Sequence, residues 1–139
     1  MLICEKKVMK IDNILLDNLT AQAQESPRLR MNMDLRNSDA DSSQRMLNAI
    51  EPGSLVPIHR HRSTSETMVV LRGSLVEEYY DNARNCVAKI ELSAGGPASA
   101  LNIPAGQWHT LHALESGTVI LEMKDGAYEA IQPEDIMTI

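Results

Sequence analysis

The sequence predicts a mostly β, single-domain protein with a short N-terminal α-helix. The chain has 139 residues and no internal repeat, which suits one domain with a single core. Residues 11–24 have the apolar spacing of a helix, whereas after Pro27 short apolar segments alternate with turn residues. Short strands between turns are typical of a β sandwich or barrel. We therefore expect a helical segment over residues 1–25 and a β-barrel over residues 26–139, joined in one structural domain.

The N-terminal helix is predicted from apolar residues at positions 11, 14, 15, 19 and 23, which form one stripe along a helix. Asp and Asn residues near its start are suitable caps. Ser26 should end the helix, because the residue before a proline is disfavoured in the helical region. If the apolar stripe packs on a second copy of the chain, the protein is a homodimer.

Turn residues mark the ends of the predicted strands. Residues 37–43 form a polar loop, and Pro52-Gly53 is a turn signal. The predicted strands cover residues 45–50, 67–71, 71–80, 86–92 and 118–124. The strands at 71–80 and 86–92 should pair as a hairpin across residues 81–85.

Composition excludes several classes of partner. A formal net charge of -6 argues against binding to nucleic acid or to an anionic membrane, since both need a basic surface. Cys4 and Cys86 form no C-x-x-C pair and are too few for a disulfide scaffold, so we expect reduced thiols. The N-terminal residues lack the apolar stretch of a signal peptide, and no segment is apolar enough to span a membrane. We expect a cytoplasmic protein with a small-molecule ligand.

The segment from Gly53 to Gly73 predicts a metal site. Side chains alternate along an extended strand, so His59 and His61 point to the same face and Arg60 points away. After a turn over residues 62–65, Glu66 would begin the next strand and add a carboxylate oxygen. Two imidazoles and one carboxylate therefore converge on one ion.

A fourth metal ligand is expected at His109. It follows the turn signal Pro104-Ala-Gly and begins another apolar segment. All four histidines of the chain fall within these two segments. His112 has the opposite strand parity to His109, so we expect it outside the ligand shell.

These residues resemble the two motifs of the cupin superfamily. The first segment fits the pattern G(X)5HXH(X)4E(X)6G at every fixed position. In the second motif, Pro104, Gly106 and His109 fit the P-X-G-X-X-H centre, whereas Ala113 stands where asparagine is usual. The resemblance implies a jelly-roll β-barrel that binds metal.

The chain as a whole is similar to the WbuC family of small cupin-fold metalloproteins. That family occurs in bacterial gene clusters for surface polysaccharides, which implies a ligand from polysaccharide biosynthesis. Ala127 replaces the proline that is usual in the last matching segment. Besides the H-R-H segment, the matching segments are residues 26–32, 44–49, 108–110 and 122–128.

The predicted ligand set suits one divalent transition metal ion. Three neutral histidines and one carboxylate leave coordination positions open for water or substrate. Zinc, iron, manganese, nickel and copper all accept imidazole and carboxylate, so the set does not select among them.

Further residues are candidates for holding the ligand or moving a proton. Arg28 and Arg30 should share a strand face, and with Arg45 they could hold a carboxylate or phosphate. Surface arginines and structural ion pairs are the alternative reading. Trp108 is a further candidate ligand contact, and Tyr128, Glu122 and Lys124 are the catalytic candidates.

Four functions are compatible with these features. The leading hypothesis is a metal-dependent protein that binds or acts on a small polar ligand, such as a sugar or sugar nucleotide. An Fe(II)-dependent dioxygenase for a small molecule is the second. A non-catalytic ligand-binding or sensor module and a metal-free sugar epimerase are the others. The sequence does not decide whether the protein is an enzyme.

Overall fold

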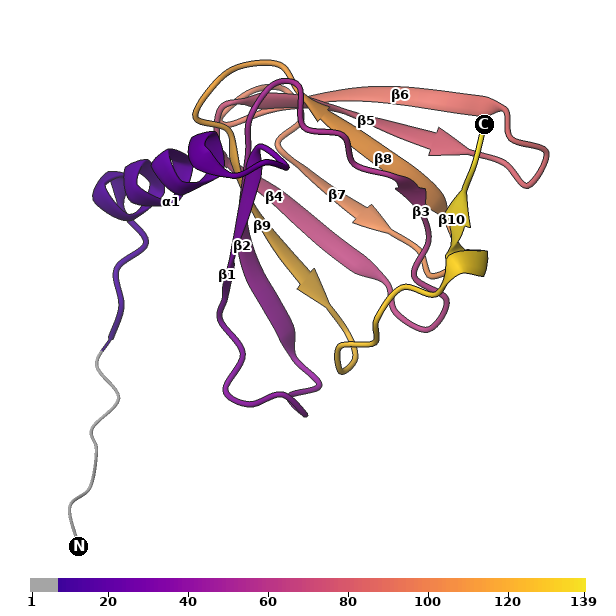
Figure 1. The fold of residues 1–139 in the computed structure, drawn as a ribbon, viewed down its shortest axis with the longest axis horizontal. Helices are drawn as coiled ribbons and strands as arrows, with labels where there is room; N and C mark the ends of the chain where they lie inside the picture. Colours follow the sequence, from indigo (N-terminus) through magenta and orange to yellow (C-terminus); the bar gives the residue numbers. More distant parts are fainter. Residues whose placement is uncertain (1–7) are drawn as a thin grey trace, which may run out of the picture.

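The computed structural model describes residues 8–139, so Cys4 and the start of the predicted segment 1–25 lie outside the described residues. One helix, α1 (Asn13–Glu25), precedes two five-stranded antiparallel sheets (Figure 1). The first sheet has the order β1-β2-β9-β4-β7 and the second has the order β10-β3-β8-β5-β6. The strands are β1 (Arg30–Asp34), β2 (Gln44–Ile50), β3 (Ile58–His59), β4 (Glu66–Arg72), β5 (Ser74–Tyr80), β6 (Cys86–Ser93), β7 (Ala100–Ile103), β8 (Trp108–Ala113), β9 (Val119–Lys124) and β10 (Ile136–Met137), with a 3-10 turn, η1 (Pro133–Asp135), before the last. The predicted mostly β class is confirmed.

Helix α1 forms where the sequence predicts it. The Asp12 side chain accepts a hydrogen bond from the Leu15 backbone N–H at 3.1 Å, and Ser26 ends the helix in an extended conformation. The predicted apolar stripe is wrong in part, because Ile14 is 72% exposed. The buried face is instead centred on Leu16 and Leu19, which pack over the outer side of the first sheet. Within residues 8–139, no helix combines the length and apolarity needed to cross a bilayer.

Gly73 divides a segment that the sequence predicts as one strand. Residues 71–80 were expected to be continuous, but β4 ends at Arg72 and β5 begins at Ser74. Gly73 has φ +86°, and a Cβ at this position would lie 2.7 Å from the Thr118 Cα. At this point the chain passes from the first sheet to the second.

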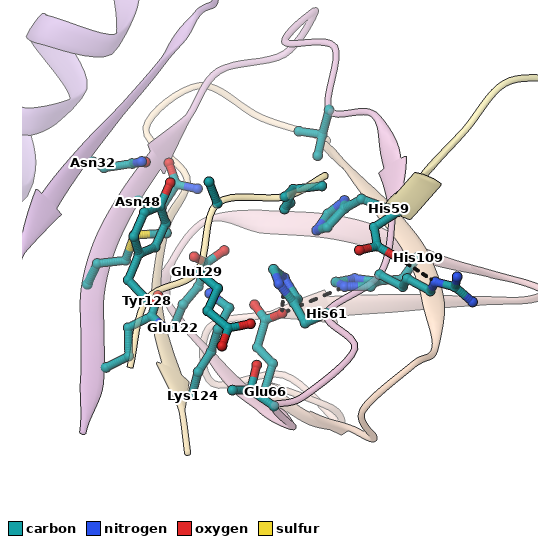
Figure 2. A pocket seen from close by; sticks show the side chains of 18 of the residues that line it. Asn32, Asn48, His59, His61, Glu66, His109, Glu122, Lys124, Tyr128 and Glu129 are labelled. Atoms are coloured by element: carbon teal, nitrogen blue, oxygen red, sulfur yellow. Dashed lines mark hydrogen bonds and ion pairs between the residues drawn. The ribbon is translucent and has the colours of Figure 1, made fainter. Parts of the chain in front are cut away.

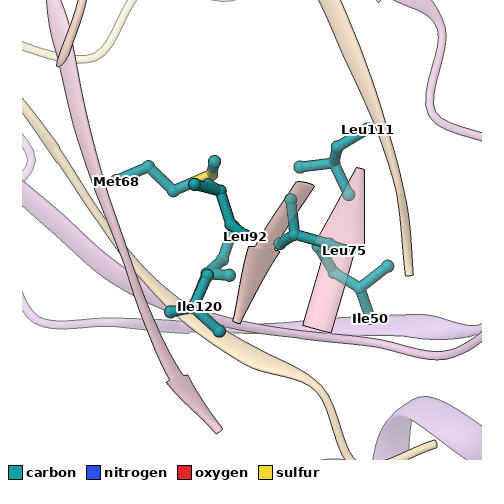
Figure 3. Packing of buried hydrophobic residues seen from close by; sticks show 7 residues of the cluster. Ile50, Met68, Leu75, Leu92, Leu111 and Ile120 are labelled. Carbon is teal, nitrogen blue, oxygen red and sulfur yellow. The ribbon is translucent and has the colours of Figure 1, made fainter. Parts of the chain in front are cut away.

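The two sheets face each other across a core that is apolar at one end and polar at the other. Apolar residues from both sheets pack together in one cluster (Figure 3). On four strands, a buried polar residue lies two positions from a buried apolar one, and therefore on the same inward face. The pairs are Glu66 with Met68, Glu77 with Leu75, His109 with Leu111, and Glu122 with Ile120. This segregation places the candidate site at one end of the barrel.

A buried carboxylate fastens α1 to the apolar end. Glu51 accepts hydrogen bonds from Ser116 Oγ at 2.5 Å, the Gly117 backbone N–H at 2.8 Å and Gln24 Nε2 at 3.0 Å. Burial alone would raise the pKa of Glu51, but these three hydrogen bonds outweigh it and lower the pKa. The carboxylate form therefore stabilises the fold.

We expect Glu51→Gln to lower the free energy of unfolding by about 1–2 kcal/mol at pH 7, because it weakens hydrogen bonds to a charged acceptor. The folded-state pKa is below that of the unfolded chain, so this stabilisation is present above a pH of about 4 and is lost as the pH falls through the folded pKa. Urea unfolding at several pH values measures the difference, with the exposed Glu25→Gln as the control. A difference that is unchanged at low pH would contradict the assignment.

Candidate metal centre

Four side chains from three strand regions meet at the polar end of the barrel. His59 lies on β3, His61 follows two residues later, His109 lies on β8 and Glu66 begins β4. His59 and His109 are direct cross-strand neighbours, so the pairing of β3 with β8 sets their approach. All four line a cavity of about 1070 Å³ (Figure 2). The predicted metal ligands therefore come together in space.

The distances among these side chains are short enough for one ion. One nitrogen from each of the three histidines lies within 4.8 Å of the others. Glu66 Oε2 is 3.6 Å from His61 Nε2 and 3.7 Å from His109 Nε2. Figure 2 shows the imidazoles and this carboxylate pointing toward a common space.

Hydrogen bonds to the Nδ1 atoms orient two of the rings. His59 Nδ1 lies 2.8 Å from the Pro57 carbonyl oxygen, and His109 Nδ1 lies 2.5 Å from Glu77 Oε1. When Nδ1–H donates in each bond, Nε2 keeps its lone pair toward the cavity. Glu77 is fully buried and was not predicted as a site residue.

Burial determines the electrostatics of the site. It is the main reason that the pKa of His59 and of His109 falls to about 4 and that of His61 to about 3. The imidazoles are therefore neutral near pH 7, which is the form that binds metals. Burial, together with the charge of Glu122, also raises the pKa of Glu66 above its usual range.

The unsatisfied atoms of the site fit a metal ion. Glu66 Oε2 and His109 Nε2 are buried and have no hydrogen-bond partner among residues 8–139. An unpaired buried polar atom is costly, and a cation bound between these atoms would satisfy both. Imidazole nitrogen and carboxylate oxygen are donors that divalent transition metals accept.

Asp135, the last residue of the 3-10 turn η1, ties the C-terminal segment to the two arginines that flank His61. Arg60 and Arg62 both bond Asp135 Oδ1, at 2.9 and 2.5 Å. The Arg60 guanidinium also lies over the Trp108 ring, 4.4 Å from its centroid, and Trp108 Nε1 donates to Asn82 Oδ1 at 2.9 Å. Trp108, a predicted ligand contact, therefore packs against Arg60 and does not line the cavity.

The three predicted arginines differ in their surroundings. Leu29 has φ 55°, so Arg28 precedes β1 and is not part of the same regular strand as Arg30, contrary to the prediction. Arg28 and Arg30 nevertheless both line the cavity. Arg30 Nη1 donates to the Leu55 carbonyl at 2.9 Å. Arg45 Nη2 donates to the Leu35 carbonyl at 3.0 Å and lies 3.7 Å from Asp41, so its guanidinium has structural partners.

The predicted catalytic candidates all line the cavity. Glu122 is buried, and Lys124 is half-buried and pairs across the strands with Glu66. Tyr128 is 60% exposed and lies under the Arg36 guanidinium, 5.6 Å from the ring centroid. Figure 2 shows Lys124 between Tyr128 and Glu66.

His112 lies away from the histidine cluster. Its Nε2 is 2.6 Å from Glu78 Oε1, and its side chain is 50% exposed. Glu78 and His112 face outward, whereas the neighbouring Glu77 and His109 face inward. Sequence reasoning missed Glu77 and the buried Asn48, which the observed strand registers place on the same inward faces as Tyr79 and Ile50.

A family model described as a domain of unknown function (DUF6016) matches residues 11–92, which is more than half of the chain. The chain belongs to this family. No match was found in a sequence comparison of this DUF6016 member with curated proteins.

Solved structures similar to this DUF6016 member show its fold. CapF, a capsular polysaccharide assembling protein from Staphylococcus aureus, is 19% identical with a TM-score of 0.64, over 81% of this chain and 32% of CapF. KdgF from Halomonas sp. is 15% identical with a TM-score of 0.59, over 75% of this chain and 84% of KdgF. Oxalate oxidase in complex with glycolate is 15% identical with a TM-score of 0.64, over 78% of this chain and 57% of the oxidase.

These neighbours are cupin-fold proteins, so the predicted cupin fold is confirmed. The chain spans about a third of the length of CapF and somewhat more than half of the oxalate oxidase. At these identities the likeness concerns the fold alone.

Proposed function

We propose that this DUF6016 member is a metal-binding cupin that binds or acts on a small polar ligand beside His59, His61, Glu66 and His109. One observation carries the proposal. The buried atoms Glu66 Oε2 and His109 Nε2, which would bind the metal, have no hydrogen-bond partner among the described residues. They line a cavity large enough for a small molecule.

The three histidines and Glu66 would hold one divalent transition metal ion. Zinc, iron, manganese and nickel each suit these donors. Such an ion, when bound, supplies Lewis acidity toward a ligand oxygen.

The chain's own residues would position the ligand and move a proton. Lys124 lies beside Glu66 and brings a positive charge to the same end of the cavity. Glu122 and Tyr128 also line the cavity, where a carboxylate or a phenol can exchange a proton with a bound hydroxyl. Arg28 and Arg30 are the candidates for holding an anionic group.

Two observations favour a sugar or sugar nucleotide of surface-polysaccharide synthesis as the ligand. The chain resembles the WbuC family over most of its length. In addition, its fold is similar to that of CapF, which is described as a capsular polysaccharide assembling protein. We also propose that the protein is cytoplasmic, where such nucleotides are available. That the protein forms a homodimer remains a prediction.

Thermal unfolding with a panel of UDP-, dTDP- and GDP-sugars tests the proposal. We expect at least one compound to raise the melting temperature of the metal-loaded protein. The rise should be absent after metal removal and in a variant with both His59→Ala and His61→Ala. If no sugar nucleotide changes the melting temperature, the sugar-nucleotide assignment is wrong, and oxygen uptake that requires added Fe(II) would favour the dioxygenase alternative.

A further inference from the structure

Two buried polar side chains of the first sheet have no structural partner. Asn48 on β2 and Glu122 on β9 are each 8% exposed, and both line the cavity. Asn48 Oδ1 is buried without a hydrogen bond, and within residues 8–139 the Glu122 carboxylate likewise has no hydrogen bond or ion pair, although its oxygens are not fully buried. Buried polar groups are normally paired, because leaving one unpaired destabilises the fold. The absence of a partner for these two side chains therefore indicates that a ligand bound in the cavity forms hydrogen bonds with them.

Asn48 and Glu122 form one continuous surface. Asn48 lies directly across from Ile120, and Glu122 is two residues farther along the same inward face of β9. Diagonal neighbours of this kind are about 7 Å apart, which one six-membered ring can bridge. Asn32, the cross-strand neighbour of Asn48 on β1, extends the surface toward solvent. Figure 2 shows Asn32 and Asn48 across the cavity from His59 and His109.

The chemistry of this surface selects hydroxyl groups. As a carboxylate, Glu122 only accepts hydrogen bonds, whereas the Asn48 amide both accepts and donates. The unpaired atom of Asn48 is its Oδ1, so this oxygen and the Glu122 carboxylate both require a ligand group that donates a hydrogen bond, as a hydroxyl does. A carboxylate or phosphate at the same place would instead meet the negative charge of Glu122.

We infer that Asn48 and Glu122 form a hydroxyl-binding wall, which holds hydroxyls of a sugar ring or another polyol opposite the histidines. The inference names the ligand class for the proposed function and rests on it in treating the cavity as the binding site. It also assigns Glu122 a role in ligand recognition in addition to its candidacy for proton transfer.

The first test is the stability of variants that replace each polar group by an apolar one of similar size. Asn48→Leu removes an unpaired buried oxygen, and Glu122→Met removes a negative charge that opposes ionisation of the buried Glu66, so each should raise the melting temperature of the ligand-free protein by about 2–5 °C. Their metal content should equal that of the wild type. The matched control is Glu129→Gln, an exposed carboxylate that lines the same cavity, and it should leave the melting temperature unchanged.

The second test is binding of D-glucose, D-galactose, D-mannose and myo-inositol, measured by saturation-transfer NMR. At least one should bind the wild type, and its affinity should fall about tenfold or more in Asn48→Leu and in Glu122→Met, because each loses a hydrogen bond to the polyol. Glu129→Gln should bind like the wild type.

Several outcomes would overturn the hydroxyl-binding wall. Lower melting temperatures in both variants would show a structural role, and reduced metal content in Glu122→Met would show a role at the metal. Absence of polyol binding, or equal binding in wild type and variants, would also overturn it. Failure of the proposed function can be told apart from failure of the hydroxyl-binding wall. Wild-type protein that takes up no metal contradicts the proposed function, whereas the wall is tested separately by the melting temperatures and polyol binding of the variants.

Discussion

A variant with both His59→Ala and His61→Ala is expected to lose its bound metal completely. The two imidazoles supply half of the four proposed donors, and the remaining pair, Glu66 and His109, leaves too few protein ligands for tight binding. Elemental analysis of untagged protein, before and after reloading with zinc, iron, manganese or nickel, gives the metal content per chain. The wild type should contain near-stoichiometric metal and the double variant only background.

The same variant should also lose the stabilisation that metal gives to the folded chain. A ligand present at about 100 times its dissociation constant adds about 2.7 kcal/mol to the free energy of unfolding. Added metal should therefore raise the melting temperature of the wild type and leave that of the double variant unchanged. His112→Ala is the matched control, because this histidine lies outside the cluster and pairs with Glu78.

Two results would contradict the metal site. Full metal content in a folded double variant would show that these histidines are not ligands. A wild type that takes up no metal, even after reloading, would instead favour a metal-free acid/base pocket. Circular dichroism of the double variant distinguishes loss of the site from loss of the fold.

The clustering of the four proposed metal ligands could be predicted because their signals are local. The spacing of His59 and His61 follows from the alternation of a strand, and the length of the next turn brings Glu66 to the same place. His109 required a second turn signal farther along the chain. Pairing of β3 with β8 then completes the cluster, and that pairing is a tertiary feature that the local signals do not contain.

Glu77 could not be predicted in the same way. Glu77 and Glu78 are adjacent, as are Tyr79 and Tyr80, so both faces of β5 have nearly the same composition. Parity shows that only one glutamate of the pair faces inward, but not which one. Only the register against β8, which places Tyr79 opposite His109, identifies Glu77 as the inner residue.

Two of the errors in the fold, at α1 and at Gly73, have similar physical causes. The apolar spacing along α1 allowed several faces, and contact with the outer sides of β1 and β2 selected the one that contains Leu16. The apolar run through Gly73 resembled one long strand, but the left-handed conformation of this glycine directs the chain into the other sheet. In both cases tertiary packing overrode a local pattern.

Glu77→Gln is expected to lower metal affinity by about 10–100-fold, although Glu77 is not itself a proposed ligand. Its carboxylate lies 2.5 Å from His109 Nδ1, where it orients the ring and increases the electron density available at Nε2. Glutamine keeps the size of the side chain but removes the charge, so the ring stays in place and becomes a weaker donor. Competition with a chelating indicator measures the metal affinity of each protein.

The matched control for Glu77→Gln is Glu78→Gln, which changes the adjacent carboxylate on the outer face of β5. Glu78 bonds His112 and not the cluster, so its variant should retain wild-type metal affinity. The metal-free form of Glu77→Gln should melt close to the wild type, because burial raises the pKa of Glu77 to about 9 and the side chain is neutral without metal. A cation bound at His109 would favour the carboxylate, so the charge that glutamine removes belongs to the metal-bound form. Equal metal affinity in all three proteins would mean that Glu77 fills space beside His109 without tuning it.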